Sequence, residues 1–179
     1  MIPIDIIIKY YPENNDLRKI LVNHSAAVAK KALDIAQLHP EMNLDMLFIY
    51  EAAILHDIGI YKTKAPEIYC FGELPYICHG YLGSDILNAE NLPRHALVCE
   101  RHTGTGLSKE YIVKNNLPLP LRDMMPISLE EQLICFADKF FSKTRPDKEK
   151  TIAKVRAHLA KHGIDSVNKF DEWCEMFIA

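Results

Sequence analysis

Residues 56–59 of this chain read His-Asp-Ile-Gly, which places an imidazole directly beside a carboxylate. Donors of these two kinds, with no thiolate among them, suit Fe, Mn, Co, Ni, Zn or Mg. Two more such donors, His24 and Asp138, stand between apolar residues at helical spacing. A buried carboxylate is costly unless it is paired or bound to a metal. We therefore predict that His24, His56, Asp57 and Asp138 meet in one metal centre.

Three helices must position these four residues. Residues 17–35 repeat apolar side chains every three or four positions, which predicts a long helix with His24 on its buried face. A second helix is expected to start after Asn43 and to end at His56, where Gly59 would suit a left-handed C-cap. The His-Asp pair would then lie in the last turn of that helix.

The helix that carries Asp138 has a distinct start signal. Ser128 and Glu131 have the spacing of a capping box, in which a hydroxyl and a carboxylate accept hydrogen bonds from free backbone amides at a helix N-terminus. Apolar residues then recur on both sides of Asp138. Further helices are predicted over residues 79–88, 93–102, 108–116, 152–159 and 167–177.

The whole pattern favours an all-α fold. Residues 61–78 are interrupted by Pro and Gly, so we interpret them as a loop with little regular structure, and we find no convincing pair of strands. A chain of 179 residues is the size of one domain. We expect a single domain over 1–179, with a core of about 14–145 and C-terminal helices of about 147–178 packed on it.

Composition excludes several classes of function. The net charge is −3 and the basic residues are scattered, so we expect no nucleic-acid duplex as a partner. The five cysteines contain no C-x-x-C pair, which argues against a disulfide framework and against a thiolate zinc site. The apolar N-terminus has no basic leader, and no stretch is long enough to span a bilayer. We predict a cytoplasmic protein without a membrane partner, either a monomer or a homodimer.

The four predicted ligands follow the order H…HD…D along the chain, which resembles the HD superfamily of metal-dependent phosphohydrolases. The neighbouring residues agree with this resemblance. The pair continues with Ile-Gly at 58–59, as in the HDIG subgroup, and small residues precede it within 52–55. Asp138 stands between Ala137 and Lys139, which also fits the superfamily. The resemblance implies an HD-domain helical bundle that holds divalent metal and hydrolyses phosphate compounds.

Members of the superfamily with two metals have two further histidines between the HD pair and the last Asp. The matching positions are His79 and His102, and the resemblance implies that Asp57 bridges two ions, with Fe or Mn favoured. The extended pattern is similar to that of bacterial hydrolases that split diadenosine tetraphosphate symmetrically and of some cyclic-nucleotide phosphodiesterases. From the residues alone, His79 could instead cap a helix and His102 could lie on the surface. His95 competes with His102 but is expected to be structural.

Positive side chains are expected to hold the phosphate. Lys139 follows the last ligand and is predicted to be catalytic, together with Asp57, and to bind substrate. Arg145 lies further along the chain and would suit two-pronged phosphate binding, although a solvated helix end would look the same. Lys62, in a loop over the site, and Thr103, through backbone amides near it, complete the predicted substrate-binding set.

Together these residues predict a metal-dependent phosphohydrolase that cleaves a phosphoester or phosphoanhydride in a small molecule, with a nucleotide as the favoured substrate. Metal-bound hydroxide would be the nucleophile, because coordination brings the pKa of bound water to about 7. Residues 61–78 and 107–126 are expected to line the substrate pocket. Three alternatives stay open, namely an HD-type di-iron oxygenase, a nucleotide-binding protein without catalysis, and a structural zinc protein.

Overall fold

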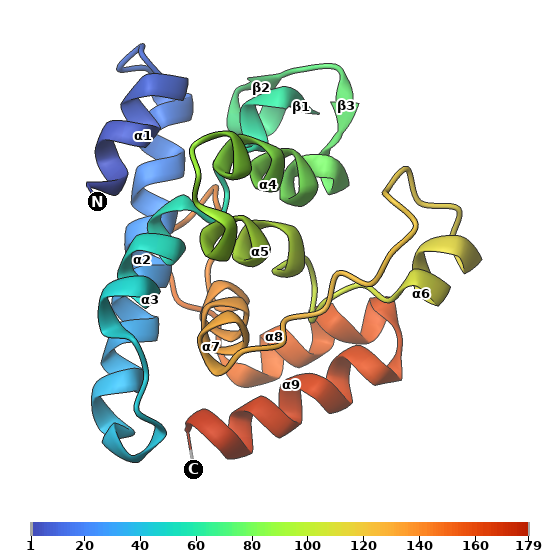
Figure 1. Cartoon of the computed structure of the whole chain (residues 1–179). Helices are drawn as coiled ribbons and strands as arrows, with labels where there is room; N and C mark the ends of the chain where they lie inside the picture. The colour runs from blue at the N-terminus through green and yellow to red at the C-terminus, as the bar shows by residue number, and fades with distance from the viewer. Residues whose placement is uncertain (1, 179) are drawn as a thin grey trace.

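The computed structural model of this protein describes residues 2–178 and is built mainly from α-helices (Figure 1). The helices are α1 Pro3–Tyr10, α2 Asp16–Leu38, α3 Met46–Leu55, α4 His79–Ala89, α5 Pro93–Arg101, α6 Lys109–Lys114, α7 Leu129–Asp138, α8 Ile152–Leu159 and α9 Ile164–Phe177. Short 3-10 helices lie at η1 Pro40–Met42, η2 Ile60–Lys62, η3 Pro66–Ile68, η4 Tyr76–Cys78 and η5 Ala160–His162. The prediction of an all-α single domain is confirmed. Among residues 2–178, no helix has both the length and the apolar character needed to cross a membrane.

One small sheet stands against the prediction that residues 61–78 form an irregular loop without strands. Strands β1 Thr63–Ala65, β2 Cys70–Phe71 and β3 Leu74–Pro75 lie in the order β2-β1-β3, with β1 antiparallel to β2 and parallel to β3. Strands of two or three residues are too short to show an alternating pattern in the sequence. Gly72 closes the sheet because its amide donates to the Thr63 carbonyl at 2.9 Å, and a Cβ there would overlap the backbone of Lys62.

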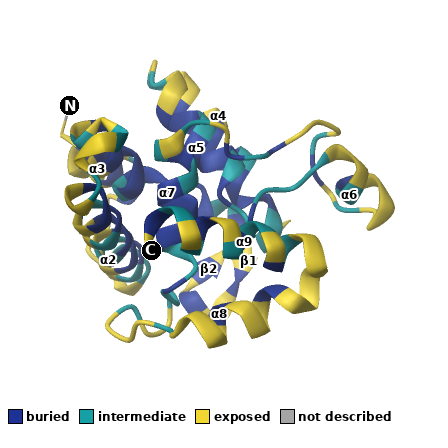
Figure 2. Cartoon of the chain, turned by 90° about the horizontal axis from the view of Figure 1, so that it is seen from below, coloured by how far each residue is buried: buried dark blue, intermediate teal, exposed yellow. Residues whose placement is uncertain are grey.

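The main core lies where α2, α3 and α7 meet the C-terminal helices α8 and α9. Phe136 of α7 contacts the rings of Phe170, Trp173 and Phe177 of α9, and all four side chains are fully or almost fully buried. The Trp173 indole also donates to Gln132 Oε1 at 2.9 Å. Figure 2 shows this buried interior beneath the exposed outer faces of α8 and α9. Each buried aromatic side chain contributes about 1.5 to 3 kcal/mol, so α9 holds α7 firmly in place.

The helix that carries Asp138 starts almost as its sequence predicts. Ser128 Oγ accepts from the Glu131 amide at 3.1 Å, which is the first half of a capping box. The Glu131 carboxylate, however, accepts from the amide of Ile127 at 3.0 Å rather than from that of Ser128. The same carboxylate receives the Arg101 guanidinium at 2.9 Å. This partly buried ion pair ties the end of α5 to the start of α7.

Glycines allow the turn after α3 to lie directly against α4. Gly59 has φ −81°, so the prediction of a left-handed C-cap is wrong. Its real constraint is space, because a Cβ at Gly59 would lie 2.3 Å from the His79 carbonyl oxygen and 2.5 Å from the Gly83 amide nitrogen. Gly80 lies close to α5, where a Cβ would be 2.8 Å from the Cys99 carbonyl oxygen. The close approach brings His79 to the turn that carries the His-Asp pair.

Candidate metal centre

Six buried or nearly buried side chains from five helices and their ends meet inside the molecule. They form two donor groups that share one carboxylate, His24, His56, Asp57 and Asp138 in the first and Asp57, His79 and His102 in the second. The first group comes from α2, the turn after α3, and α7, as the sequence predicts. The second comes from the start of α4 and the residue after α5. The donor atoms of each group lie within 4.8 Å of one another.

The first group has the spacing of ligands around one ion. The Nε2 atoms of His24 and His56 lie 3.2 and 3.1 Å from Asp57 Oδ2, and 3.0 and 3.5 Å from Asp138 Oδ1. Ligand atoms that are about 2.1 Å from one ion lie about 3.0 to 3.4 Å from each other. Within residues 2–178, His56 Nε2 and both Asp57 oxygens are buried without a well-formed hydrogen bond, although Asp57 Oδ2 forms an ion pair with Lys143 at 2.7 Å. The donor set therefore fits a divalent cation.

Three of the histidines are oriented by the same local device. Each stands just after a helical turn and directs Nδ1 to a backbone carbonyl three residues earlier, at 2.7 Å. The pairs are His56 with Ala53, His79 with Tyr76, and His102 with Cys99. Ala53 and Cys99 lie in the last turns of α3 and α5, where carbonyls lack an intrahelical partner and are free to accept. The Tyr76 carbonyl accepts from the His79 backbone amide as well as from its ring. Because a carbonyl can only accept, Nδ1 carries a proton in each ring, and Nε2 is the atom that faces the centre and would coordinate a metal.

The two histidines of the second group face each other in a way that favours a positive charge between them. His79 Nε2 and His102 Nε2 lie only 3.0 Å apart, and both Nδ1 atoms already hold the ring protons. Burial lowers the pKa of both rings, to about 3 for His79, so neither ring readily takes up a proton to bridge the gap. Asp57 Oδ1 lies 3.4 Å from each Nε2. Two facing lone pairs beside a carboxylate oxygen form a site that a metal cation would satisfy.

Charge balance in the first group depends on its carboxylates. Burial alone would lower the pKa of His56, but Asp57 and Asp138 outweigh that effect and raise it to about 9. Burial would raise the pKa of both carboxyl groups. Lys143 and His56 nevertheless hold the pKa of Asp57 well below its usual range. Lys139 and His24 do the same for the pKa of Asp138. The two carboxylates therefore remain ionised. Metal binding by His56 would release a proton from its ring.

Two lysines contact the carboxylates, and the sequence predicts only one of them. Lys139 Nζ donates to Asp138 Oδ2 and to the His102 carbonyl, both at 2.9 Å. Lys143 Nζ lies 2.7 Å from Asp57 Oδ2 and was not among the predicted site residues. Lys143 is a basic residue five positions after Asp138, but Arg145 offers the same signal in the sequence.

Solvent can approach the centre from the side of α7. The Asp138, Lys139 and Lys143 side chains are 12, 10 and 15% exposed, whereas Asp57 and His56 are fully buried. The other predicted substrate-binding residues have different surroundings. Arg145 is exposed, and its amide closes a turn on the Ser142 carbonyl at 3.1 Å; Thr103 is half-buried beside His102; Lys62 Nζ lies 5.9 Å from the Tyr61 ring centre.

His95 lies outside both donor groups, and the sequence predicts it to be structural. Its Nε2 lies 3.3 Å from Glu51 Oε2, and its ring meets the Phe48 ring edge-on at 5.0 Å. Burial lowers the pKa of His95, although Glu51 opposes that shift. His95 joins α5 to α3 without belonging to either candidate ligand group.

Comparison with known families decides the class of this bundle. The family described as the HD domain matches residues 21–142, which include all six candidate ligands. The chain belongs to the HD domain family. Its HD motif is His56-Asp57, and the assignment agrees with the resemblance that the sequence pattern suggests.

Relatives of this HD domain include one protein matched over most of its length and two longer proteins. An uncharacterised protein of Methanocaldococcus jannaschii is 31% identical over 146 residues, which cover 79% of each chain. Two tRNA (cytidine(56)-2'-O)-methyltransferases, from Picrophilus torridus and Thermoplasma volcanium, are 31% and 29% identical over 78% and 90% of this chain. The chain spans only 39% and 41% of the lengths of those two enzymes.

The fold of this HD domain also matches a solved structure. The crystal structure of the HD domain of the L. monocytogenes phosphodiesterase PgpH covers 97% of this chain and 87% of its own, with a TM-score of 0.55 and 20% identity. A likeness at that identity is a likeness of fold. The two proteins therefore share the helical bundle, and the comparison gives no information on a shared substrate.

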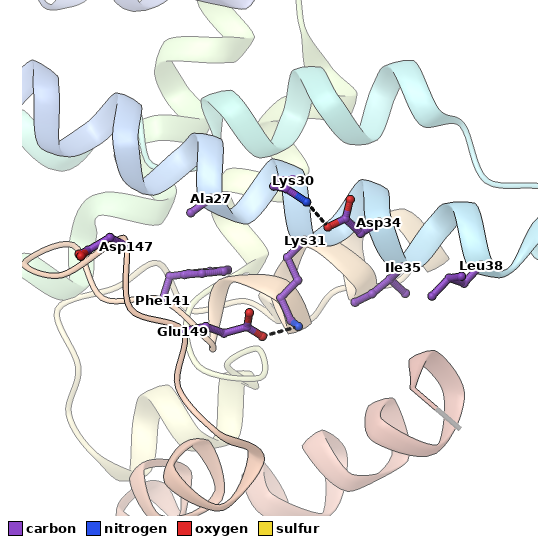
Figure 3. Close-up of a pocket in the computed structure, with 9 residues that line it drawn as sticks. All are labelled: Ala27, Lys30, Lys31, Asp34, Ile35, Leu38, Phe141, Asp147 and Glu149. Carbon is purple, nitrogen blue, oxygen red and sulfur yellow. Dashed lines mark hydrogen bonds and ion pairs between the residues drawn. The ribbon is translucent and has the colours of Figure 1, made fainter.

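A surface hollow of about 320 Å³ lies beside α2 of the HD domain, and Figure 3 shows the residues that line it. Its lining comes from α2 and from the segment that follows α7. Lys31 pairs with Glu149 at 2.7 Å and Lys30 with Asp34 at 2.5 Å, so these charges are balanced within the hollow. None of the six candidate ligands lines it. The hollow has no part in the metal centre.

Proposed function

We propose that this HD domain is a metal-dependent phosphohydrolase that cleaves a phosphoester or phosphoanhydride in a small molecule, with a nucleotide as the substrate class. The observation that carries the proposal is the pair of buried donor groups on the two oxygens of Asp57. Family membership supports a hydrolase of this kind. The printed name of PgpH, a phosphodiesterase, agrees with it.

The residues divide the work of the proposed site. His24, His56 and Asp138 would hold one ion with Asp57, and His79 and His102 would hold a second. Bound divalent cations supply Lewis acidity toward phosphoryl oxygens and lower the pKa of a coordinated water to about 7. The backbone carbonyls keep three imidazoles in the tautomer that coordinates. Fe or Mn is our proposal for the metal, with Mg, Co, Ni and Zn as the other candidates for these ligands.

Asp57 has the central part in this arrangement. Its Oδ2 faces the Nε2 atoms of the first group and its Oδ1 faces those of the second. A carboxylate with one oxygen toward each group would set the spacing of two ions. Because the side chain is fully buried, its geometry cannot relax into solvent.

Lys139 is better suited to positioning than to proton transfer. Two oxygens already engage its ammonium, and one of them is the backbone carbonyl of a ligand residue. It would hold Asp138 and His102 in register while adding positive charge near the open edge. We retain Lys139, Arg145, Thr103 and Lys62 as proposed substrate-binding residues, with Lys139 the one among them that contacts the centre.

A hydrolysis panel tests the proposal. Protein loaded with Mn²⁺ or Fe²⁺ would be assayed against nucleoside monophosphates, cyclic nucleotides, diadenosine tetraphosphate and a chromogenic phosphodiester, and the bound metal would be quantified. We expect phosphate or nucleotide release that Asp57→Ala abolishes. Activity that survives Asp57→Ala would overturn the mechanism. Oxygen consumption with an organic substrate and no phosphate release would indicate an oxygenase, and tight nucleotide binding without turnover would indicate a binding protein.

A further inference from the structure

The ammonium of Lys143 lies where it competes for a metal-ligand oxygen. Its Nζ is 2.7 Å from Asp57 Oδ2, the same oxygen that faces His24 Nε2 and His56 Nε2 at 3.2 and 3.1 Å. A divalent cation that takes this oxygen together with the two imidazoles would meet the ammonium at close range. Like charges repel strongly in a desolvated site, so the two cations cannot both hold Oδ2.

Lys139 provides the contrast, because it neutralises a ligand without blocking it. Its ammonium contacts Asp138 Oδ2, whereas Asp138 Oδ1 is the oxygen that faces His24 at 3.0 Å. The His102 carbonyl holds the same ammonium from the other side. Lys139 can therefore stay in place when the centre binds a cation, while Lys143 must move.

The surroundings of Lys143 leave it room to move toward the open edge. It lies beyond the end of α7, in the turn in which the Arg145 amide donates to the Ser142 carbonyl. The side chain is 15% exposed, although the carboxylate it contacts is fully buried. The Tyr76 hydroxyl also hydrogen bonds with this ammonium, and the Tyr76 ring stacks on that of His79. A flexible four-carbon stem keeps the charge beside the centre after it leaves Asp57.

We propose that Lys143 is an exchangeable cation, which balances Asp57 in the absence of metal, gives way to the first divalent ion and then binds an anionic oxygen of the phosphate substrate. This inference rests on the proposed function, because it requires both a metal and a phosphate. Ammonium groups form strong, charge-assisted hydrogen bonds with phosphate oxygens. The released charge would lie on the side from which solvent, and hence substrate, reaches the ligands.

Metal titration tests the first half of the proposal. Metal-free protein would be titrated with Mn²⁺ as wild type, Lys143→Met and Lys148→Met, the last a control that removes an exposed charge from the same segment. We expect Lys143→Met to bind the first ion at least tenfold more tightly than wild type and Lys148→Met to stay within twofold. Equal affinity in wild type and Lys143→Met would overturn the exchange. Thermal melts would confirm folding, and Lys143→Gln replaces Lys143→Met if the latter does not fold.

Phosphate binding tests the second half without turnover. Inorganic phosphate would be titrated into the Mn²⁺-loaded proteins, with Lys143→Arg as a variant that keeps the charge. We expect Lys143→Met to bind phosphate at least fivefold more weakly and Lys143→Arg to stay close to wild type. Unchanged phosphate affinity in Lys143→Met would overturn this role but leave the hydrolase proposal standing. Failure of the wild type to bind any Mn²⁺ would overturn both.

Discussion

The two donor groups that share Asp57 are positioned by different kinds of structure. His24 and Asp138 project from the apolar faces of long or well-packed helices, α2 and α7, which the main core holds. His79 is the first residue of α4 and His102 follows the last residue of α5, and their arrangement depends on the close contacts around Gly59 and Gly80. Side-chain packing therefore fixes the ligand positions in the first group, whereas close contacts between backbone segments fix them in the second.

The two groups should therefore be sensitive to different substitutions. A packed helix face tolerates a change at one position because many contacts hold the rest. A close contact between two backbone segments does not tolerate such a change, because one added methyl group displaces a whole helix. The substitutions below separate the two cases, beginning with the residue that both groups share.

Asp57→Ala should have the largest effect, because it removes the carboxylate from both groups at once. We expect loss of both metal ions and of all hydrolysis, measured by metal analysis and by turnover on the substrate found in the panel. A chelator should lower the melting temperature of the wild type, since a ligand that binds only the folded state stabilises it. The same chelator should leave Asp57→Ala unchanged. Full metal content in Asp57→Ala would show that neither group depends on this carboxylate.

Gly59→Ala should disrupt the second group more than the first. The added methyl would meet the His79 carbonyl and the Gly83 amide, so α4 must shift, at a cost of about 3 kcal/mol in the free energy of unfolding. Gly104→Ala is the control, because Gly104 has φ +61° but open space around its Cα, and left-handed strain alone costs about 1 kcal/mol. Denaturant unfolding and metal content would be measured. A Gly59→Ala protein with wild-type stability would contradict the close-contact explanation.

The sequence predicts the two groups unequally for the same reason. His24 and Asp138 interrupt apolar stripes of helical period, a local signal that survives without any knowledge of the fold. His79 and His102 need the superfamily resemblance, because a histidine at a helix end has many other uses. Lys143 escapes prediction altogether, since its contact with Asp57 depends on a turn after α7 that no periodicity describes. The small sheet of residues 63–75 and the true constraint on Gly59 likewise arise from contacts between segments.

His79→Ala should remove one ion and leave the other. The first group keeps all four ligands in this variant, so we expect metal content to fall from two ions to one per chain, with the helical circular dichroism spectrum unchanged. His95→Ala is the matched control, a buried histidine of α5 whose partner is Glu51. It should lose stability but keep both ions. Two ions retained in His79→Ala would place the second site elsewhere.

Ser128→Ala should have the smallest effect, and it tests whether the first group depends on local helix signals at all. Loss of the hydroxyl that accepts from the Glu131 amide should cost about 1 kcal/mol of stability. Ser108→Ala removes the equivalent cap from α6, where Ser108 Oγ accepts from the Tyr111 amide at 3.1 Å, and it should cost a similar amount.

Metal affinity shows whether either helix cap influences the metal centre. Because α9 and the Arg101–Glu131 ion pair also hold α7, Asp138 should keep its place when the Ser128 cap is lost, and Mn²⁺ affinity should stay within about twofold in both variants. A selective loss of affinity in Ser128→Ala would mean that the start of α7, rather than its packing, sets the position of Asp138. The first group would then be as dependent on a single backbone contact as the second.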